Sequence, residues 1–243
     1  MARTSAQKKS TGKPELCPEC GGTGVLYVPG SLDAKRCVCG AFEEDLLRRR
    51  LALARIPARF AEKSFETFEV ARGDSARRQI RNTAMSFATT FDPTSPETDK
   101  GLRLHGSVGS GKTHIAVAIL REVIRRGYSG IYYNFSDLLD DLRGSFNEKN
   151  SNEGWRILED VEQADLLVLD DIGAESTTDW VRDRLYLIVN RRYENGKALI
   201  ITTNLDFKDL DARVGPRTMS RFMEMCDEFV PFPKDDWRRR QMR

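Results

Sequence analysis

Short apolar runs recur along the chain from residue 102 onward, and each is long enough for one buried strand. Strands buried on both faces of a parallel sheet read as continuous runs of Leu, Ile and Val rather than as alternating patterns. Five runs predict strands here: Leu102–His105, Gly130–Asn134, Asp165–Asp171, Ala198–Asn204 and Phe229–Phe232.

Amphipathic segments separate these runs, with apolar positions at helical spacing. They predict helices over His114–Arg126, over Ser136–Leu142 with Ser136 as the N-cap, and over Thr178–Glu194, which Gly196 follows. Strands that alternate with helices predict a three-layer α/β fold around a parallel sheet.

A further helix is predicted over Ala41–Arg55, where leucines lie near helical spacing and arginines cover the other side. Its acidic residues precede its arginines, as the helix dipole favours, and Pro57 disfavours helical geometry just before it. The helix is either a packing element or a docking element.

Composition narrows the class of protein. The 243 residues carry 39 basic and 37 acidic side chains, a net charge of +2, which disfavours a bulk polyelectrolyte role. Hydrophobic residues make up 40% of the chain, enough to bury a core. No run approaches the roughly 18 apolar residues of a membrane span, and the N-terminus lacks the apolar core of a secretory signal. We expect a cytoplasmic protein without a membrane partner.

Basic charge is concentrated locally. Residues 1–13 contain four basic groups and no acid, and Leu46–Arg59 contains five arginines and no acid. Such segments either meet nucleic acid or an acidic partner, or are solvated tails and helix faces. We divide the chain into a disordered basic tail (1–13), a cysteine module (14–40), the linking helix (41–55) and an α/β core (56–243).

Four cysteines near the N-terminus have the spacing of a metal site. They form a C-x2-C pair and a C-x-C pair separated by sixteen residues: Cys17, Cys20, Cys37 and Cys39. Four thiolates complete the closed tetrahedral shell of structural zinc, which leaves no position for catalysis.

Disulfides between these cysteines are the alternative, and a cytoplasmic location disfavours them. The string CPECGGTG matches one repeat of DnaJ-type zinc domains, which carry four, so we interpret it as a convergent zinc turn. Cys226 is expected in the core.

The first core strand leads into G-x4-G-K-T, the P-loop pattern, and an amphipathic helix follows it. The loop backbone and the helix N-terminus would cradle the phosphates. Lys112 would reach the outer phosphates, and the Thr113 hydroxyl would ligate Mg²⁺. The expected nucleotide-binding residues are Gly106, Ser107, Gly109, Ser110, Gly111, Lys112, Thr113 and His114.

Polar residues end the next two buried strands. Acids at the carboxyl end of a parallel strand lie at the phosphate crevice. Asp170 would hold Mg²⁺ through water, and Asp171 would position or activate the attacking water. Asn204 could hold that water against the γ-phosphate, or could be a turn-forming residue.

These motifs together resemble the DnaC/DnaI-type helicase loaders and the related IstB-type ATPases of the AAA+ class. The resemblance covers about residues 56–240. It rests on IPARF with FETF, GSVGSGKTHIA, DLLVLDDIGAE, W-x-R-x-x-L-x-x-I-V-N-R-R-Y-E-x-G-K, ITTNL, SRF and DDWR, in that order.

The resemblance implies further roles. Arg221 would be an arginine finger that reaches the ATP of a neighbouring subunit, unless it is a surface arginine. Arg238 would sense the γ-phosphate in cis, with Arg239 or Arg240 as alternative counterparts. Phe65–Phe68 lies where the family packs adenine. The insertion over Asp137–Gly154 would face single-stranded DNA or be a solvated loop; its candidate DNA contacts are Arg143, Phe146 and Lys149.

Some positions depart from the family pattern. Many AAA+ ATPases have Glu where this chain has Asp171, so hydrolysis is expected to be slow or stimulated. Pro216 stands where an acidic residue is expected, but proline suits the first turn of a helix. About eleven residues follow Phe232, too few for a helical lid domain.

Three functions remain in view. The first is an ATP- and Mg²⁺-dependent loader that binds the hexameric replicative helicase, delivers it onto single-stranded DNA and self-associates through its ATP site. The second is an IstB-type regulator of a transposase on duplex DNA. The third is a zinc-bearing adaptor whose ATP site is a switch with negligible turnover.

Overall fold

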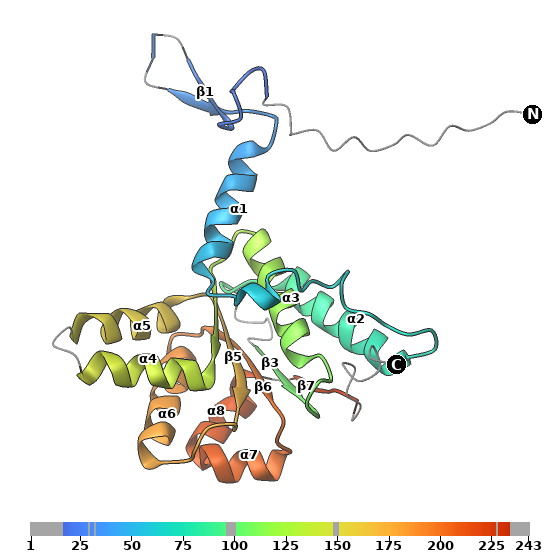
Figure 1. The fold of residues 1–243 in the computed structure, drawn as a ribbon, viewed down its shortest axis with the longest axis vertical. Helices are drawn as coiled ribbons and strands as arrows, with labels where there is room; N and C mark the ends of the chain where they lie inside the picture. Colours follow the sequence, from blue (N-terminus) through green and yellow to red (C-terminus); the bar gives the residue numbers. More distant parts are fainter. Residues whose placement is uncertain are drawn as a thin grey trace, which may run out of the picture. The chain divides into compact units, whose positions relative to one another are not determined.

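The computed structural model describes residues 17–28, 30–31, 33–95, 101–147, 151–226 and 228–233 (Figure 1). The chain divides into two compact units, Met1–Arg49 and Arg50–Arg243. The helices are α1 (Ala41–Leu53), α2 (Ser75–Thr90), α3 (Lys112–Arg125), α4 (Phe135–Asn147), α5 (Ser151–Gln163), α6 (Asp179–Glu194), α7 (Phe207–Val214), α8 (Pro216–Met225) and the 3-10 helix η1 (Ala58–Phe60).

In the second unit, five parallel strands form one sheet in the order β4-β5-β6-β3-β7. These strands are β3 (Gly101–His105), β4 (Gly130–Asn134), β5 (Leu166–Ile172), β6 (Ala198–Thr203) and β7 (Glu228–Pro231). All five were predicted from the apolar runs, to within one residue at each end. The three-layer α/β prediction is confirmed.

Alternate residues of each strand serve the two faces of the sheet. Leu167 and Leu169 of β5 belong to a core formed with residues of α4 to α8, whereas Leu166 and Val168 face α3. Figure 1 shows α3 on one side of the sheet and α6 with α8 on the other. Asp170 continues the α3-facing series, which directs its side chain toward the first turn of α3.

The predicted N-cap of α4 is wrong by two residues. Ser136 lies inside the helix, and its backbone N–H donates to the side-chain oxygen of Asn134 at 3.1 Å. Strand β4 runs into α4 with no loop between them, so the last strand residue does the capping. Asn is as good an N-cap as Ser, and it comes first along the chain.

The insertion predicted over Asp137–Gly154 is largely helical. It contains most of α4, which runs five residues beyond the predicted Leu142, and the start of α5. Residues 148–150 lie outside the described part of the chain. The sequence analysis did not identify α2, α5 or α7.

The first unit contains an antiparallel hairpin of β1 (Val25–Tyr27) and β2 (Ala34–Arg36), followed by the start of α1. Helix α1 was predicted to end at Arg55 and ends at Leu53. Across the described residues, no helix is long and apolar enough to cross a membrane.

Candidate functional site

The P-loop joins β3 to α3 at the carboxyl edge of the sheet, beside a cavity of about 980 Å³. Gly111 has a φ of +107°, and a Cβ there would lie 2.9 Å from the ring of Phe68. Gly106 has a φ of +151°, and a Cβ would lie 2.8 Å from Cβ of Phe232. Both glycines are therefore required by conformation and by space.

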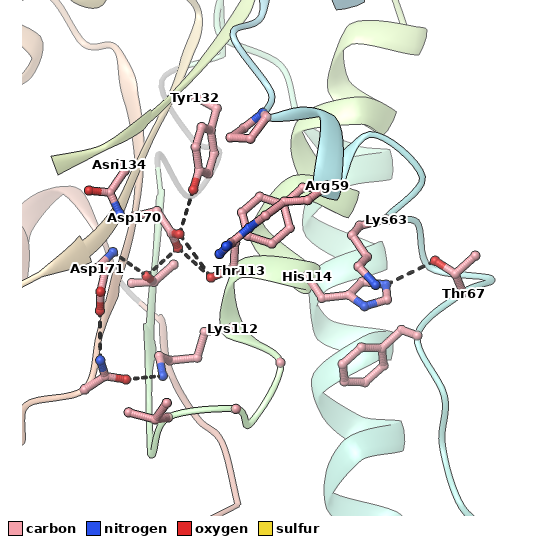
Figure 2. A pocket seen from close by; sticks show the side chains of 18 of the residues that line it. Arg59, Lys63, Thr67, Lys112, Thr113, His114, Tyr132, Asn134, Asp170 and Asp171 are labelled. Carbon is pink, nitrogen blue, oxygen red and sulfur yellow. Dashed lines mark hydrogen bonds between the residues drawn. The ribbon is translucent and has the colours of Figure 1, made fainter. Parts of the chain in front are cut away.

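Lys112 lies at the bottom of the cavity with its ammonium folded back on the loop (Figure 2). Its Nζ donates to the carbonyl oxygens of Gly106 at 2.8 Å and Ser107 at 2.9 Å, and to Oδ1 of Asn204 at 2.6 Å. Lys112 as a whole is 6% exposed. A buried cation enclosed by loop carbonyls is ready to exchange these acceptors for phosphate oxygens.

Asp170 accepts three side-chain hydrogen bonds on the α3 face of the sheet (Figure 2). The hydroxyl of Thr113 lies 3.0 Å from its carboxylate oxygens, and the hydroxyls of Tyr132 and Thr202 donate at 2.7 Å each. Burial raises the pKa of Asp170, and these three donors oppose the rise. Thr113 and Asp170 are oxygen donors of the type that Mg²⁺ prefers, so this pair could hold the ion.

A β-bulge places Asp170 and Asp171 together at the cavity. Leu169 pairs with Ile201 and Ile172 pairs with Thr203, so both aspartates oppose the single residue Thr202. Asp171 has a φ of +64°, and its N–H donates to the Thr202 hydroxyl at 2.8 Å. The bulge lets consecutive carboxylates serve one site, which a regular strand would send to opposite faces.

Asn204 lies between Lys112 and Asp171 and bonds to both. Its Nδ2 donates to Oδ1 of Asp171 at 2.8 Å, while its Oδ1 accepts from Lys112. The structure thus brings together the predicted set of Lys112, Thr113, Asp170, Asp171 and Asn204.

The other end of the cavity has an aromatic wall. The rings of Phe68 and His114 meet edge to face with centroids 5.2 Å apart, and both line the cavity. Nε2 of His114 lies 2.8 Å from the carbonyl oxygen of Ser64 and 3.2 Å from Oγ1 of Thr67. Burial lowers the pKa of His114, which favours the neutral ring at neutral pH. Within the predicted Phe65–Phe68 segment, Phe68 could pack a base, whereas Phe65 is buried outside the residues that line the cavity.

Several residues of this site escaped the sequence analysis, among them Arg59, Arg77, Tyr132 and Thr202. The side chain of Arg77 is 1% exposed, donates from Nη1 to the carbonyl oxygen of Ser110 at 2.9 Å, and pairs with Asp74 at 3.4 Å. It fixes the P-loop to α2. Arg77 and Tyr132 lie in no motif that the sequence analysis used, because each acts through a contact with a residue far along the chain. Arg59 lies within the IPARF string, which gave it no role of its own.

Arg221 lies on α8, outside the residues that line the cavity. Its guanidinium stacks 3.9 Å from the centroid of the Tyr193 ring, its Nη1 lies 3.3 Å from Oε1 of Glu224, and its Nε donates to Asn190 at 3.2 Å. Helix α8 begins with Pro216 at its first turn, as predicted. The cluster presents a pre-positioned cation away from the chain's own nucleotide cavity.

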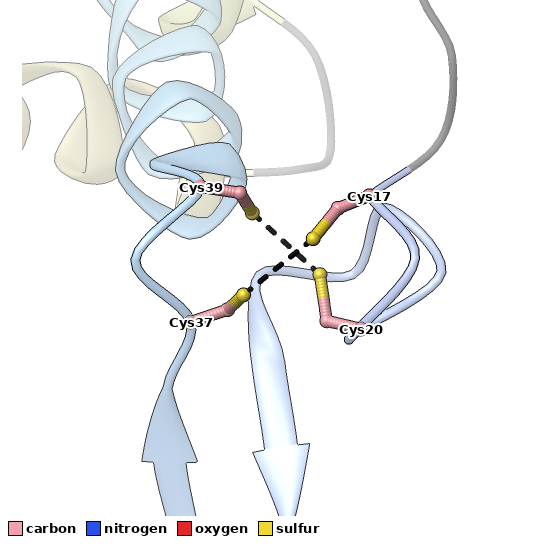
Figure 3. Close-up of side chains that lie close together, drawn as sticks. All are labelled: Cys17, Cys20, Cys37 and Cys39. Atoms are coloured by element: carbon pink, nitrogen blue, oxygen red, sulfur yellow. Dashed lines mark hydrogen bonds between the residues drawn. The ribbon is translucent and has the colours of Figure 1, made fainter.

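The four N-terminal cysteines converge in the first unit (Figure 3). Their sulfur atoms all lie within 4.8 Å of one another; Cys17 and Cys37 are 3.7 Å apart, and Cys20 and Cys39 are 3.6 Å apart. Zn–S bonds of about 2.3 Å place the sulfurs of a tetrahedron about 3.8 Å apart. The cluster therefore fits a zinc ion.

The structure says little about the predicted DNA contacts and the predicted γ-phosphate sensor. Arg143 lies over the ring of Trp180 at 4.6 Å and pairs with Asp140 at 3.5 Å. The side chain of Phe146, and all of Lys149 and Arg238, lie outside the described residues. Their roles stay predictions.

Comparisons with known proteins agree with this geometry. A family model described as "IstB-like ATP binding protein" matches residues 43–231. The chain is 26% identical to the phage-like element PBSX protein XkdC of Bacillus subtilis, over 79% of this chain and 73% of that protein. It is 29% identical to the replicative helicase loader DnaC of Escherichia coli, over 56% of this chain and 55% of that protein. The chain thus spans only about half the length of DnaC.

Among solved structures, the chain is similar to the DnaC helicase loader, with a TM-score of 0.64 and 30% identity over 73% of this chain and all of that one. It is also similar to DnaI, with a TM-score of 0.63 and 26% identity over 74% of this chain and 95% of that one. The family match spans most of the chain and includes the whole P-loop sheet. The chain belongs to the family of IstB-like ATP-binding proteins and is of the DnaC type.

Proposed function

We propose that this protein is an ATPase that binds the hexameric replicative helicase and delivers it onto single-stranded DNA. The observation that carries the proposal is the joint likeness to DnaC in sequence and to DnaC and DnaI in structure. The cluster of Lys112, Thr113, Asp170, Asp171 and Asn204 at the P-loop supports it. The cysteine module adds a candidate surface for gripping a partner.

In the proposed nucleotide cycle, Lys112 and the P-loop amides bind the β- and γ-phosphates, and Thr113 with Asp170 holds Mg²⁺. Asp171 and Asn204 lie at the open end of this group, where a water can be aligned for attack on the γ-phosphate. Asp171 is shorter than glutamate by one methylene, so we expect the turnover to be slow until DNA or a partner stimulates it.

Self-association would complete the site. Arg221 is stacked and hydrogen-bonded outside its own cavity, which supports a role in the site of a neighbouring subunit. An arginine supplied in trans stabilises the charge that develops on the transferred phosphoryl group. ATP then promotes assembly, and hydrolysis promotes release.

Helicase transfer onto circular single-stranded DNA tests the proposal. The full chain, the replicative helicase of the same organism and ATP are incubated with the DNA, and DNA-bound helicase is separated by size. We expect the protein to raise the amount of DNA-bound helicase several-fold, and Lys112→Ala to abolish this gain. Absence of any complex between the protein and the helicase, with ATP or with ADP, would contradict the proposal.

A second candidate has support from the family match itself, because the matching description is IstB-like. In that case the protein binds duplex DNA and recruits a transposase. Competition between duplex and single-stranded oligonucleotides separates the two functions: a loader prefers the single strand, and a transposition regulator prefers the duplex.

A further inference from the structure

The segment between α1 and α2 is fastened to the edge strand β4. The carbonyl oxygen of Ala54, a residue with no exposed surface, accepts the N–H of Tyr132 at 2.8 Å. Farther along the segment, the ring of Phe60 meets the ring of Tyr132 edge-on with centroids 6.3 Å apart. Residues 54–60, here called the connector, are therefore held at two points by the strand residue that also donates to Asp170.

Arg59 of the connector points into the nucleotide cavity. Its guanidinium carbon lies 4.4 Å from the centroid of the Phe60 ring, which restricts the direction of the side chain. Figure 2 shows the guanidinium extending toward the side of the cavity that holds Thr113 and Asp170. Pro57, Arg59 and Phe60 all line the cavity. The connector thus forms part of the wall opposite the P-loop.

The charge of Arg59 is available to a ligand. Acidic and basic groups both line the cavity: Arg59, Lys63, Arg77 and Lys112 against Glu69, Asp137, Asp170 and Asp171. Arg77 is bound to the Ser110 carbonyl and to Asp74, and Lys112 already has three acceptors. Within the described ranges, Arg59 forms no ion pair with a carboxylate, and its guanidinium packs on the Phe60 ring.

We propose that Arg59 binds the phosphates of the nucleotide in cis, so that the connector is part of the nucleotide site. The inference rests on the nucleotide site of the proposed function and adds a cation that lies outside the P-loop. A guanidinium matches two phosphate oxygens at once, which a lysine at the same position does not. The connector joins α1 to the core, so phosphate binding by Arg59 would order the backbone of the connector.

Arg55 provides a matched control. It lies four residues earlier in the same connector, stacks on Tyr133 at 4.9 Å and pairs with Asp141 at 3.6 Å, and is not among the residues that line the cavity. Replacing either arginine by alanine removes one positive charge from the same short segment. A general electrostatic effect would therefore appear in both variants, and a specific phosphate contact in one.

The test is titration of the full-length chain with a fluorescent ATP analogue and Mg²⁺. A lost charge-assisted hydrogen bond predicts that Arg59→Ala weakens binding about tenfold or more, while Arg55→Ala stays within about twofold. Arg59→Lys is expected between the wild type and Arg59→Ala. Hydrogen exchange gives a second readout: nucleotide should protect residues 54–63 in the wild type and in Arg55→Ala, and not in Arg59→Ala.

Wild-type affinity of Arg59→Ala, or an equal loss in Arg55→Ala, would overturn the inference. Lys112→Ala separates this failure from failure of the nucleotide site: if it loses binding while Arg59→Ala keeps it, only the role of Arg59 is refuted. If Arg59→Ala has a lower unfolding temperature than the wild type without nucleotide, Arg59→Gln replaces it as the deciding variant. Loss of affinity in a normally folded Arg59→Gln supports the contact, and wild-type affinity refutes it.

Discussion

Thr202 supports both aspartates at once. Its hydroxyl donates to Oδ1 of Asp170 and accepts from the N–H of Asp171, which the β-bulge has removed from the strand ladder. One side chain therefore satisfies the bulge and orients the candidate Mg²⁺ ligand. The strand pattern of the sequence predicts both aspartates at this edge, but nothing in the residue spacing predicts the bulge or its hydroxyl partner.

Replacement of Thr202 by valine removes the hydroxyl and keeps the shape. Loss of a side chain that hydrogen-bonds a metal ligand typically lowers metal affinity 10- to 100-fold. We therefore expect Thr202→Val to raise the Mg²⁺ concentration needed for half-maximal ATP binding about tenfold. The measurement is ATP-analogue binding at varied Mg²⁺. Thr202→Ser should retain most of the affinity, and equal behaviour of both variants would contradict the role of the hydroxyl.

Asp171→Asn preserves size and the oxygen that accepts from Asn204, and removes the carboxylate charge. We expect ATP binding within about twofold of the wild type and turnover lowered at least about 100-fold, the scale of general-base loss. Phosphate release under saturating ATP measures it. Asp183→Asn, on the exposed face of α6, is the control and should turn over normally. Unchanged turnover in Asp171→Asn would exclude Asp171 as the water-activating residue.

At the scale of elements, the buried Arg192 of α6 ties several chain segments together. It has no exposed surface and donates to the carbonyl oxygens of Val161, at the end of α5, and of Ala198, at the start of β6. Burial lowers its pKa to about 9. The guanidinium thus supplies donors where a helix end and a strand start would otherwise have unpaired carbonyls.

Arg192→Met should therefore destabilise the core strongly. Unpaired buried carbonyls and loss of a charged donor predict a decrease of about 3 kcal/mol in the free energy of unfolding, measured by urea denaturation. The adjacent Arg191, which is 38% exposed and pairs with Glu162, is the control; Arg191→Met should cost under about 1 kcal/mol. Similar losses in both variants would show that the buried contacts of Arg192 contribute little.

The elements also show what the sequence could and could not predict. Short apolar runs identified the strands of the core sheet, most clearly β5 and β6, whose full burial leaves continuous Leu, Ile and Val in the sequence. The P-loop spacing predicted the turn from β3 into α3 for a different reason, because phosphate binding requires those residue types in local order. The cap at Asn134 was misassigned to Ser136, because two good N-caps lie two residues apart and only the strand end decides between them. Arg77 and Tyr132 were missed because long-range contacts leave no local pattern, whereas Arg59 was noted only as part of the IPARF string.

At the scale of the whole molecule, the cysteine cluster belongs to the first unit and the nucleotide cavity to the second. All four candidate zinc ligands lie between residues 17 and 39, and each unit has its own internal contacts. Loss of metal should therefore leave the nucleotide site intact.

Cys17→Ser tests this independence. We expect zinc content to fall from about one ion per chain to near zero, because three thiolates leave the structural shell open. ATP-analogue affinity and the unfolding transition of the core should be unchanged. Cys226→Ala, in the core beside the Leu199 carbonyl, should keep its zinc. Wild-type zinc content in Cys17→Ser would refute the four-cysteine site.

Assembly is the other prediction at this scale. Arg221→Ala should spare ATP binding and lower turnover by up to about 10³-fold, removing its dependence on protein concentration. Arg217→Ala, one turn earlier on the exposed face of α8, should be close to the wild type. Mixing Arg221→Ala with Lys112→Ala should restore turnover, since the second variant supplies the arginine and the first an intact site. Failure of the mixture would place Arg221 outside the neighbour's site.

The hydrogen bonds that Lys112 already makes affect the heat of ATP binding. It has three N–H groups, and all three have acceptors in the loop carbonyls and Asn204. An arriving phosphate therefore replaces hydrogen bonds of Lys112 rather than adding to them, which lowers the heat released at this residue. Other contacts of the nucleotide, and the water that it expels from the cavity, then supply most of the favourable free energy of binding. In a calorimeter, ATP binding should be weakly exothermic and favoured by entropy.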